Sequence, residues 1–348
     1  MTKHLNTLIK LSFVLCAMLL AYGCSDDETD LGPAPEAAFT ISSESELREL
    51  REITFLNESK GGKSFFWSFG DGEVAYGKNQ KHTYHFPGEY TVTLEATANG
   101  KRDVYQEKIN IEGDEYELYF MNNDVLELQK IKLTAPTDVS TVFSLTGFGI
   151  GLAYDEINEE FYYTDDDNLS IVRNSLSGSD ETLISDGFTE PRDIALDLPN
   201  DRLFVNDKSN NQIIKVNLTN GSQSVIVSDL DNPNFISPEA IDLVDDQLYM
   251  TVVARDSETV WTCNTDGQNL TNIINYSKGG YGYALEIDKN NVSLYFDDSD
   301  SGSILKSDLN GENVDVVGST TSEVYGIAIN SAKNKIYWAD LNGNIKEA

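Results

Sequence analysis

A short aromatic pattern returns every 42 to 46 residues through the C-terminal part of this chain. Each copy is an apolar run followed by small, amide or acidic residues, as in EFYYTDD at 160–166 and SLYFDDS at 293–299. The central aromatic residues of the six copies are Tyr119, Tyr162, Phe204, Tyr249, Tyr295 and Tyr337. A regular period of this size indicates a repeat architecture. Repeat scaffolds often present extended surfaces for binding.

The copies share an internal order of four predicted strands. An apolar strand such as IGLAYD (150–155) comes first, and the aromatic strand follows. A third strand, QIIKVNLTNG at 212–221 for example, ends in a glycine turn before a short edge strand such as SVIV (224–227). Four strands with glycine turns are typical of a β-propeller blade.

Counting these strands gives six aromatic strands but only five first strands and five edge strands. Four blades are therefore expected to have four strands, and the first and last blades three each. The last copy stops at NIKEA (344–348), before its expected turn and edge strand. We expect that a C-terminal segment that closes the ring is missing from this sequence, since an open sheet edge invites aggregation.

The repeat motifs resemble a known propeller family. IYWAD (336–340) departs by one residue from the Tyr-Trp-Thr-Asp motif of low-density-lipoprotein-receptor-type propellers. SDLNG (307–311) and NTDG (264–267) resemble the Leu-Asp-Gly turn of the same family. The resemblance covers residues 114–348 and implies a six-bladed propeller.

Residues 36–112 show short alternating strands broken by turns. Tyr90, Val92, Leu94 and Ala96 alternate with polar residues, which predicts a half-buried strand. About seven strands fit this segment, as in a β-sandwich. WSFGDG (67–72) and HTYHFPGEYTVTL (82–94) resemble the two hallmark segments of the polycystic kidney disease (PKD) domain. The resemblance implies an immunoglobulin-like β-sandwich that serves as a spacer or a protein-contact module.

Within these motifs we expect structural roles. Trp67 is expected to fill the core of the sandwich. Gly70 and Gly72 permit a turn that a β-carbon would strain, and Asp71 can cap this turn. The chain as a whole is thus expected to be all-β, with an immunoglobulin-like sandwich followed by a six-bladed propeller.

The N-terminus carries targeting signals. Residues 1–23 combine a basic start with an apolar core, which predicts a secretory signal peptide. LLAYGC, ending in Cys24, resembles a bacterial lipobox and implies cleavage before Cys24 and lipidation of this cysteine. The acidic run at 25–30 resembles the export signal of Bacteroidota surface lipoproteins, and residues 24–35 form the tether. We expect a protein anchored by lipid to the outer membrane and exposed on the cell surface.

The composition limits the classes of partner that the chain can bind. Acidic residues outnumber basic ones 58 to 25, giving a formal net charge of −33, which argues against nucleic acid and anionic lipid headgroups as partners. We expect the acidic residues to form a solvated surface, and we predict no cofactor. Acidic loops that bind calcium are the alternative. The three cysteines do not suggest an intramolecular disulfide framework.

Acid and amide residues recur near the strand ends of the repeats. Because a catalytic residue should be present in one blade only, recurrence indicates a shared structural duty such as turn capping. The residues assigned to this duty are Asp155, Asp165, Asp197, Asn206, Asp288, Asp297 and Asp340.

Residues that differ between the copies are better candidates for ligand binding. The loops before the first strands are expected to surround one mouth of the central channel, and another candidate follows the fourth aromatic strand. Aromatic rings beside a guanidinium and a carboxylate suit contact with sugars or peptides, and ordinary loop and channel packing is the alternative. The candidates are Phe148, Arg192, Glu239, Arg255, Tyr283 and Tyr325.

The sequence favours binding over catalysis. No histidine follows His85, so the repeat region has none for a catalytic triad. A calcium-dependent hydrolase or lactonase in the propeller channel is the alternative, with Glu239 as one possible ligand. The favoured hypothesis is a monomeric, surface-anchored lipoprotein whose propeller binds an extracellular glycan or protein.

Overall fold

A computed structural model describes residues 32–254, 256–277 and 282–348 of the chain. The signal peptide, Cys24, the acidic run and Arg255 lie outside the described residues. The chain divides into two compact units, residues 1–112 and 113–348. Within the described residues, no helix is long and apolar enough to span a membrane. Three short 3-10 helices are present there: η1 (Leu198–Asn200), η2 (Lys208–Asn210) and η3 (Ser331–Lys333).

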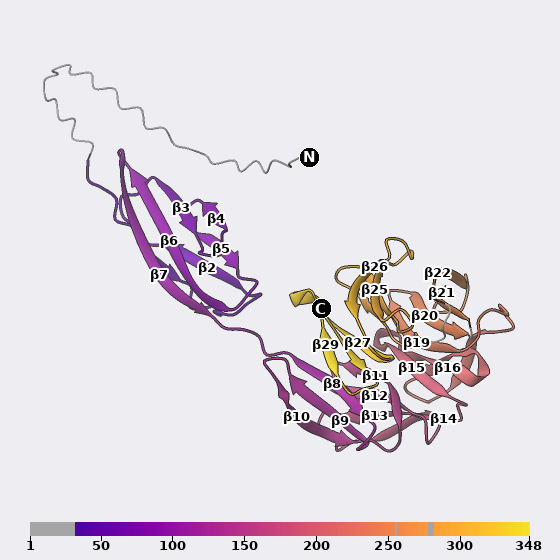
Figure 1. Cartoon of the computed structure of the whole chain (residues 1–348). Coiled ribbons are helices and arrows are strands. Elements are labelled where there is room, and N and C mark those ends of the chain that lie inside the picture. Colours follow the sequence, from indigo (N-terminus) through magenta and orange to yellow (C-terminus); the bar gives the residue numbers. More distant parts are fainter. Residues whose placement is uncertain (1–31, 255, 278–281) are drawn as a thin grey trace, which may run out of the picture. The chain divides into compact units, whose positions relative to one another are not determined.

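The first unit is an antiparallel sandwich of two sheets (Figure 1). One sheet has the order β1-β2-β5, and its strands are β1 (Phe39–Ile41), β2 (Glu52–Asn57) and β5 (Gln80–Thr83). The other has the order β4-β3-β6-β7, with β3 (Ser64–Ser68), β4 (Val74–Tyr76), β6 (Gly88–Ala98) and β7 (Lys101–Ile111). These seven strands confirm the expected sandwich.

Alternation along β6 places one side of the strand in the core. Val92, Leu94 and Ala96 are fully buried, as the period-2 pattern predicts. Trp67 is also fully buried and donates a hydrogen bond from its indole nitrogen to the Gly77 carbonyl (3.1 Å). The core position predicted for Trp67 is confirmed.

The turn after Trp67 is held by backbone and side-chain contacts. Gly70 has φ +89°, and a β-carbon there would lie 2.8 Å from the Thr91 carbonyl oxygen. Asp71 Oδ1 accepts a hydrogen bond from the Glu73 amide (3.0 Å), which is the predicted cap. The second oxygen of Asp71 lies 2.6 Å from His82 Nε2, and the His82 ring stacks on Phe69.

The second unit contains six antiparallel sheets within the described residues, each a simple meander, and is a six-bladed β-propeller. The first sheet has β8 (Glu117–Asn122), β9 (Glu127–Lys132) and β10 (Ala135–Ser144). The second has β11 (Gly149–Asp155), β12 (Glu160–Asp165), β13 (Ser170–Ser175) and β14 (Thr182–Asp186). The third has β15 (Pro191–Asp197), β16 (Arg202–Asp207), β17 (Gln212–Asn217) and β18 (Gln223–Ser228).

The remaining sheets repeat this arrangement. The fourth has β19 (Pro238–Val244), β20 (Gln247–Ala254), β21 (Ser257–Asn264) and β22 (Thr271–Ser277). The fifth has β23 (Leu285–Asp288), β24 (Ser293–Asp298), β25 (Ser303–Asp308) and β26 (Asp315–Ser319). The last has β27 (Val324–Asn330), β28 (Lys335–Asp340) and β29 (Ile345–Glu347). Four four-stranded sheets flanked by two three-stranded ones match the count expected from the repeats.

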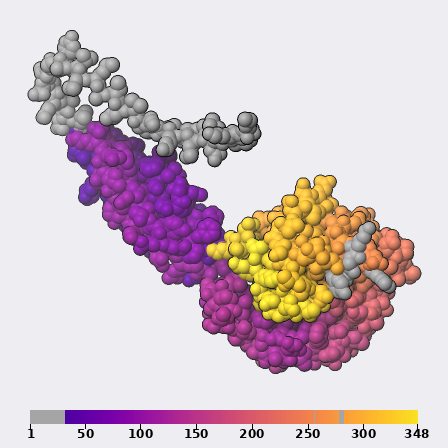
Figure 2. Space-filling view, viewed as in Figure 1, coloured from indigo at the N-terminus to yellow at the C-terminus, as the bar shows by residue number. Residues whose placement is uncertain are grey.

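Consecutive sheets of the propeller pack face to face. Five apolar clusters fill the spaces between neighbouring sheets, so each sheet shares its core only with the sheets beside it. In Figure 2 the surface of this unit passes without a break from magenta through orange to yellow. Cys263 is buried in one of these clusters as a free thiol, and burial raises its pKa to about 12.

The recurring acids cap turns, with one correction of position. Asp155 accepts hydrogen bonds from the backbone amides of Ile157 and Asn158, and Asp288 accepts the equivalent pair from Asn290 and Asn291. Asp165, Asp197 and Asp340 likewise bind residues of the turns that follow them. Turn capping is therefore the role of these five residues.

Asn206 was assigned to this duty wrongly, and Asp297 shares the duty with the residue after it. The turns after β16 and β24 are bound by the next residues, because Asp207 binds Asn210 and Asp298 binds the Ser301 amide. Successive side chains of a strand point to opposite faces, so a shift of one residue changes the environment completely. Both polar side-chain atoms of Asn206 are buried without a hydrogen-bond partner among the described residues. Asp297 accepts one hydrogen bond from the Ala284 amide and another from the Ser299 hydroxyl in the turn after β24.

Candidate functional site: the mouth of the propeller

Four of the predicted binding residues begin, or lie just before, the innermost strands of neighbouring sheets. Arg192 is the second residue of β15, and its Nε lies 2.7 Å from Glu239 Oε2 on β19. Glu239 is 2% exposed, so this ion pair is largely removed from water. Lys208 of η2 binds the other oxygen of Glu239 at 2.8 Å. Both oxygens of this buried carboxylate are therefore bound by cations.

Two tyrosines continue the site beyond the ion pair. The rings of Tyr283 and Tyr325 stack with their centroids 5.2 Å apart and an angle of 17° between their planes. The Arg192 guanidinium lies 6.0 Å from the centre of the Tyr283 ring. Tyr325 remains 44% exposed, so part of an aromatic surface faces solvent. We call Arg192, Glu239, Tyr283 and Tyr325 the mouth cluster.

Phe148 lies beside this cluster rather than within it. Its ring is 44% exposed, and no hydrogen bond, ion pair or ring contact among the described residues joins it to the mouth cluster. The link is indirect, because the Asp166 amide donates to the Phe148 carbonyl (2.8 Å). Burial raises the pKa of Asp166, and the nearby positive charge of Arg192 partly offsets this effect.

Lys208, Glu190 and Asp166 were missed by sequence reasoning. Lys208 bridges Glu239 and Glu190, whose carboxylate lies 3.3 Å from its Nζ. Burial would raise the pKa of Glu190, but the hydrogen bond from Ser209 and the charge of Lys208 lower it overall. Asp166 and Lys208 each directly follow a capping acid, at a position where the repeats differ. The difference between the copies at these two positions could have identified Asp166 and Lys208 as candidates in the sequence.

Two partly buried carboxylates join the inner strands of neighbouring sheets. Asp193 of β15 accepts hydrogen bonds from the amides of Ile194 (2.9 Å) and Ile241 on β19 (3.0 Å). Asp242 on β19 repeats the arrangement with Leu243 and with Ile287 on β23. Burial raises the pKa of Asp193 to about 7. These carboxylates replace the hydrogen bonds that adjacent strands of one sheet would make directly.

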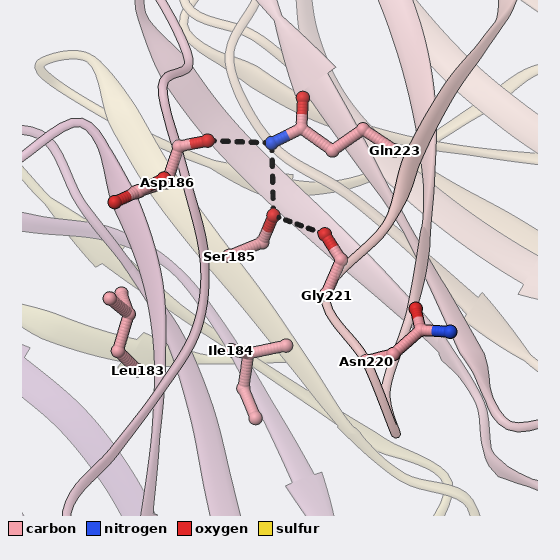
Figure 3. Close-up of a pocket in the computed structure, with 7 residues that line it drawn as sticks. All are labelled: Leu183, Ile184, Ser185, Asp186, Asn220, Gly221 and Gln223. Carbon is pink, nitrogen blue, oxygen red and sulfur yellow. Dashed lines mark hydrogen bonds between the residues drawn. The ribbon is translucent and has the colours of Figure 1, made fainter.

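A groove of about 480 Å³ lies away from the mouth cluster, where β14 meets the turn before β18 (Figure 3). Its polar groups bind one another. The Ser185 hydroxyl donates to the Gly221 carbonyl (2.9 Å), and the Gln223 amide donates to Ser185 Oγ and to the Asp186 carbonyl. These contacts join the second and third sheets, so we assign the groove a structural role.

Comparison with known proteins agrees with this architecture. Residues 33–111 match the PKD domain model, which supports the immunoglobulin-like sandwich. A chain of a crystal structure of a nidogen–laminin complex is 20% identical, with a TM-score of 0.57 over 66% of this chain and 86% of that chain. A protein of unknown function from Bacteroides thetaiotaomicron VPI-5482 is 14% identical, with a TM-score of 0.53 over 87% of this chain and 81% of that chain. At these identities the two structures show similarity of fold alone.

Proposed function

We propose that this protein binds an extracellular glycan or protein through the mouth cluster of its propeller. The observation that carries the proposal is the half-exposed pair of stacked tyrosines beside a cation-bound buried carboxylate. Stacked aromatic rings offer a flat apolar surface, and the guanidinium supplies directional hydrogen-bond donors. Together these groups match the few placed polar contacts and aromatic surface of a ligand site.

The rigidity of the cluster supports a binding role. Arg192 and Lys208 hold Glu239 from two sides, so the guanidinium and the carboxylate are fixed before any ligand arrives. A preorganised site loses less conformational entropy on binding than a mobile one does. For the alternative of a calcium-dependent hydrolase, Glu239 would have to leave both cations to coordinate the metal.

The test uses the secreted form of the chain on glycan and protein arrays. Tyr325→Ala removes the exposed ring without opening the core, and we expect it to weaken capture about tenfold or more, or roughly 1.4 kcal/mol. The double variant Arg192→Ala/Glu239→Ala removes the ion pair as a unit and should weaken capture further. Val316→Ala, at an exposed position of β26, is the matched control and should bind as the wild type does. Equal capture by the Tyr325 variant would refute the site.

We further propose that the protein acts as a monomer anchored to the outer face of the outer membrane through lipidated Cys24, with the PKD domain as a spacer. The lipobox-like LLAYGC and the acidic run after it support this localisation. Cells fed a labelled fatty acid should incorporate it into the wild type and not into Cys24→Ser. Protease added to intact cells should degrade the wild-type protein, whereas a resistant protein would place it inside the envelope.

A further inference from the structure

Three carboxylates from two neighbouring sheets meet close to the mouth cluster, because Ser299, which follows Asp298, accepts a hydrogen bond from the Val324 amide beside Tyr325. Glu258 lies near the start of β21, Asp298 ends β24, and Asp300 lies in the turn that follows. One oxygen atom from each lies within 4.8 Å of the others. Glu258 and Asp298 are buried, and Asp300 is exposed. Three negative charges at this spacing repel one another, and a bound cation would relieve that repulsion.

A buried hydroxyl belongs to the same region, because β22 pairs with β21 and Ser277, which follows Tyr276, lies opposite Glu258. The phenolic oxygen of Tyr276, on β22, is fully buried and has no hydrogen-bond partner among the described residues. Its ring packs against Phe296 with the centroids 4.9 Å apart. Burial raises the pKa of Tyr276, and the charges of Asp297, Glu258, Asp298 and Asp300 raise it further. Because buried hydroxyls are nearly always hydrogen-bonded, this one indicates a group that the protein itself does not supply.

Asp298 differs from the equivalent acids of two other sheets. In Asp165, Oδ2 accepts hydrogen bonds from Thr146 and Asn168, and in Asp207 it accepts one from Asn210. The residue three positions after Asp298 is Ser301, which binds only Oδ1 through its amide. No hydrogen bond from the described residues reaches Asp298 Oδ2, and neither Asp298 nor Asp300 forms an ion pair there. The fifth sheet therefore keeps an acceptor that the second and third sheets fill with asparagine.

We propose that Glu258, Asp298 and Asp300 bind a calcium ion, with the Tyr276 hydroxyl at the border of its coordination shell. Carboxylate oxygens are the ligands that Ca²⁺ prefers, and the cluster offers neither the imidazole nor the thiolate that zinc favours. Water admitted on the side of exposed Asp300 would complete the six to eight ligands that Ca²⁺ takes. The ion would link the fourth sheet to the turn of the fifth.

The test titrates the metal-free full chain with Ca²⁺ by calorimetry and with Tb³⁺ by luminescence excited through tyrosine. We expect one saturable site with a dissociation constant of about 10⁻⁴ to 10⁻³ M, the range of extracellular calcium modules. Tb³⁺ emission should appear with the wild type, because Tyr276 lies at the site, and should fall when Ca²⁺ is added in excess. The melting temperature should rise with Ca²⁺, because the ion binds only the folded chain.

Variants decide whether the three carboxylates form the site. Asp300→Asn removes one ligand charge at an exposed position, and we expect its affinity for Ca²⁺ to fall about tenfold or more. Asp315→Asn removes one exposed charge from the same sheet and should bind as the wild type does. Glu258→Gln should abolish binding. If that buried substitution prevents folding, Asp300→Asn still decides the question. Absence of saturable binding, or equal affinity in Asp300→Asn and the wild type, would overturn the proposal.

Discussion

The sandwich and the propeller are both built from antiparallel strands, yet they distribute their apolar side chains differently. In the sandwich, ten buried residues form one cluster around Trp67. In the propeller, the buried residues are divided among five separate interfaces between successive sheets. A core substitution in the sandwich therefore acts on the whole unit, whereas one in the propeller acts first on a single interface.

The largest expected effect tests the single core of the sandwich. Trp67→Ala removes the central ring and its hydrogen bond to Gly77, and we expect a loss of about 3–5 kcal/mol in the free energy of unfolding. Because small domains have only about 5–15 kcal/mol, the unfolding transition of the sandwich should nearly disappear. Calorimetry of the full chain measures it, with the exposed Tyr76→Ala as the control. A sandwich transition that survives unchanged would contradict the single-core description.

A second prediction compares two adjacent residues of one propeller strand, Asn206 and Asp207 of β16. Asp207→Ala leaves the partly buried amides of Thr189 and Glu190 without their acceptor, and should lower the free energy of unfolding by about 1 kcal/mol. Asn206→Leu removes two buried polar atoms that have no partner among the described residues, and should be neutral or stabilising. Chemical denaturation measures both. The same sign for the two variants would show that the residues share one role.

The third prediction concerns pH, because the propeller joins its inner strands through partly buried carboxylates. The pKa of Asp193 is about 7 in the folded chain, above the ordinary value of 3.8, so the folded state holds its proton more tightly. Ionised Asp193 therefore destabilises the fold: this penalty is absent below about pH 4, grows as pH rises, and is complete above about pH 7.

Asp193→Asn removes this penalty but also replaces one of the two side-chain oxygens that accept hydrogen bonds from backbone amides. At pH 4 the variant should be about 1 kcal/mol less stable than the wild type, and the difference should shrink or reverse by pH 7. Denaturation of both chains across this range measures the difference. A constant difference between the two proteins would exclude the titration of Asp193 as its source.

The smallest effect compares matched deletions of one methylene group. Ile53→Val in the sandwich and Ile213→Val in the propeller both change fully buried residues, and each should lower the free energy of unfolding by about 0.5–1.5 kcal/mol. The melting temperature should fall about twice as far in the sandwich, because a small unit has less unfolding entropy. Equal shifts in the two transitions would indicate that the two units unfold together.

The fold could be predicted because its signals are periodic. Each aromatic strand repeats a buried pattern set by packing against the next sheet, and the period counts the sheets directly. The period does not show which residue at the end of a strand faces the turn. Asn206 and Asp207 are both plausible capping residues in the sequence, and only the pairing of β16 with β17 decides which one faces the turn.

Part of the candidate site could also be predicted, because the repeats fix the positions of the first strands. Arg192, Glu239, Tyr283 and Tyr325 follow from the position of the first strands, and the structure brings them together. Lys208 was missed because the capping role in this copy was assigned to Asn206 and not to Asp207, which directly precedes the lysine. Glu258 and Asp298 lie forty positions apart in the chain, so no local spacing could indicate that their carboxylates meet.

At the ends of the aromatic strands, a capping acid is followed by a residue that differs between the copies. This arrangement affects which substitutions the fold can tolerate during evolution. In the second and third sheets, an acid that the fold needs is followed at once by a residue, Asp166 or Lys208, that the fold does not prescribe. Substitutions at these two positions, and at Leu341 after Asp340, can alter the charge at these strand ends while the capping acids stay in place. In the fifth sheet Ser299 is less free to change, because its hydroxyl binds Asp297 and the Val324 amide. Randomising Asp166, Lys208 and Leu341 should yield folded propellers that differ in surface charge.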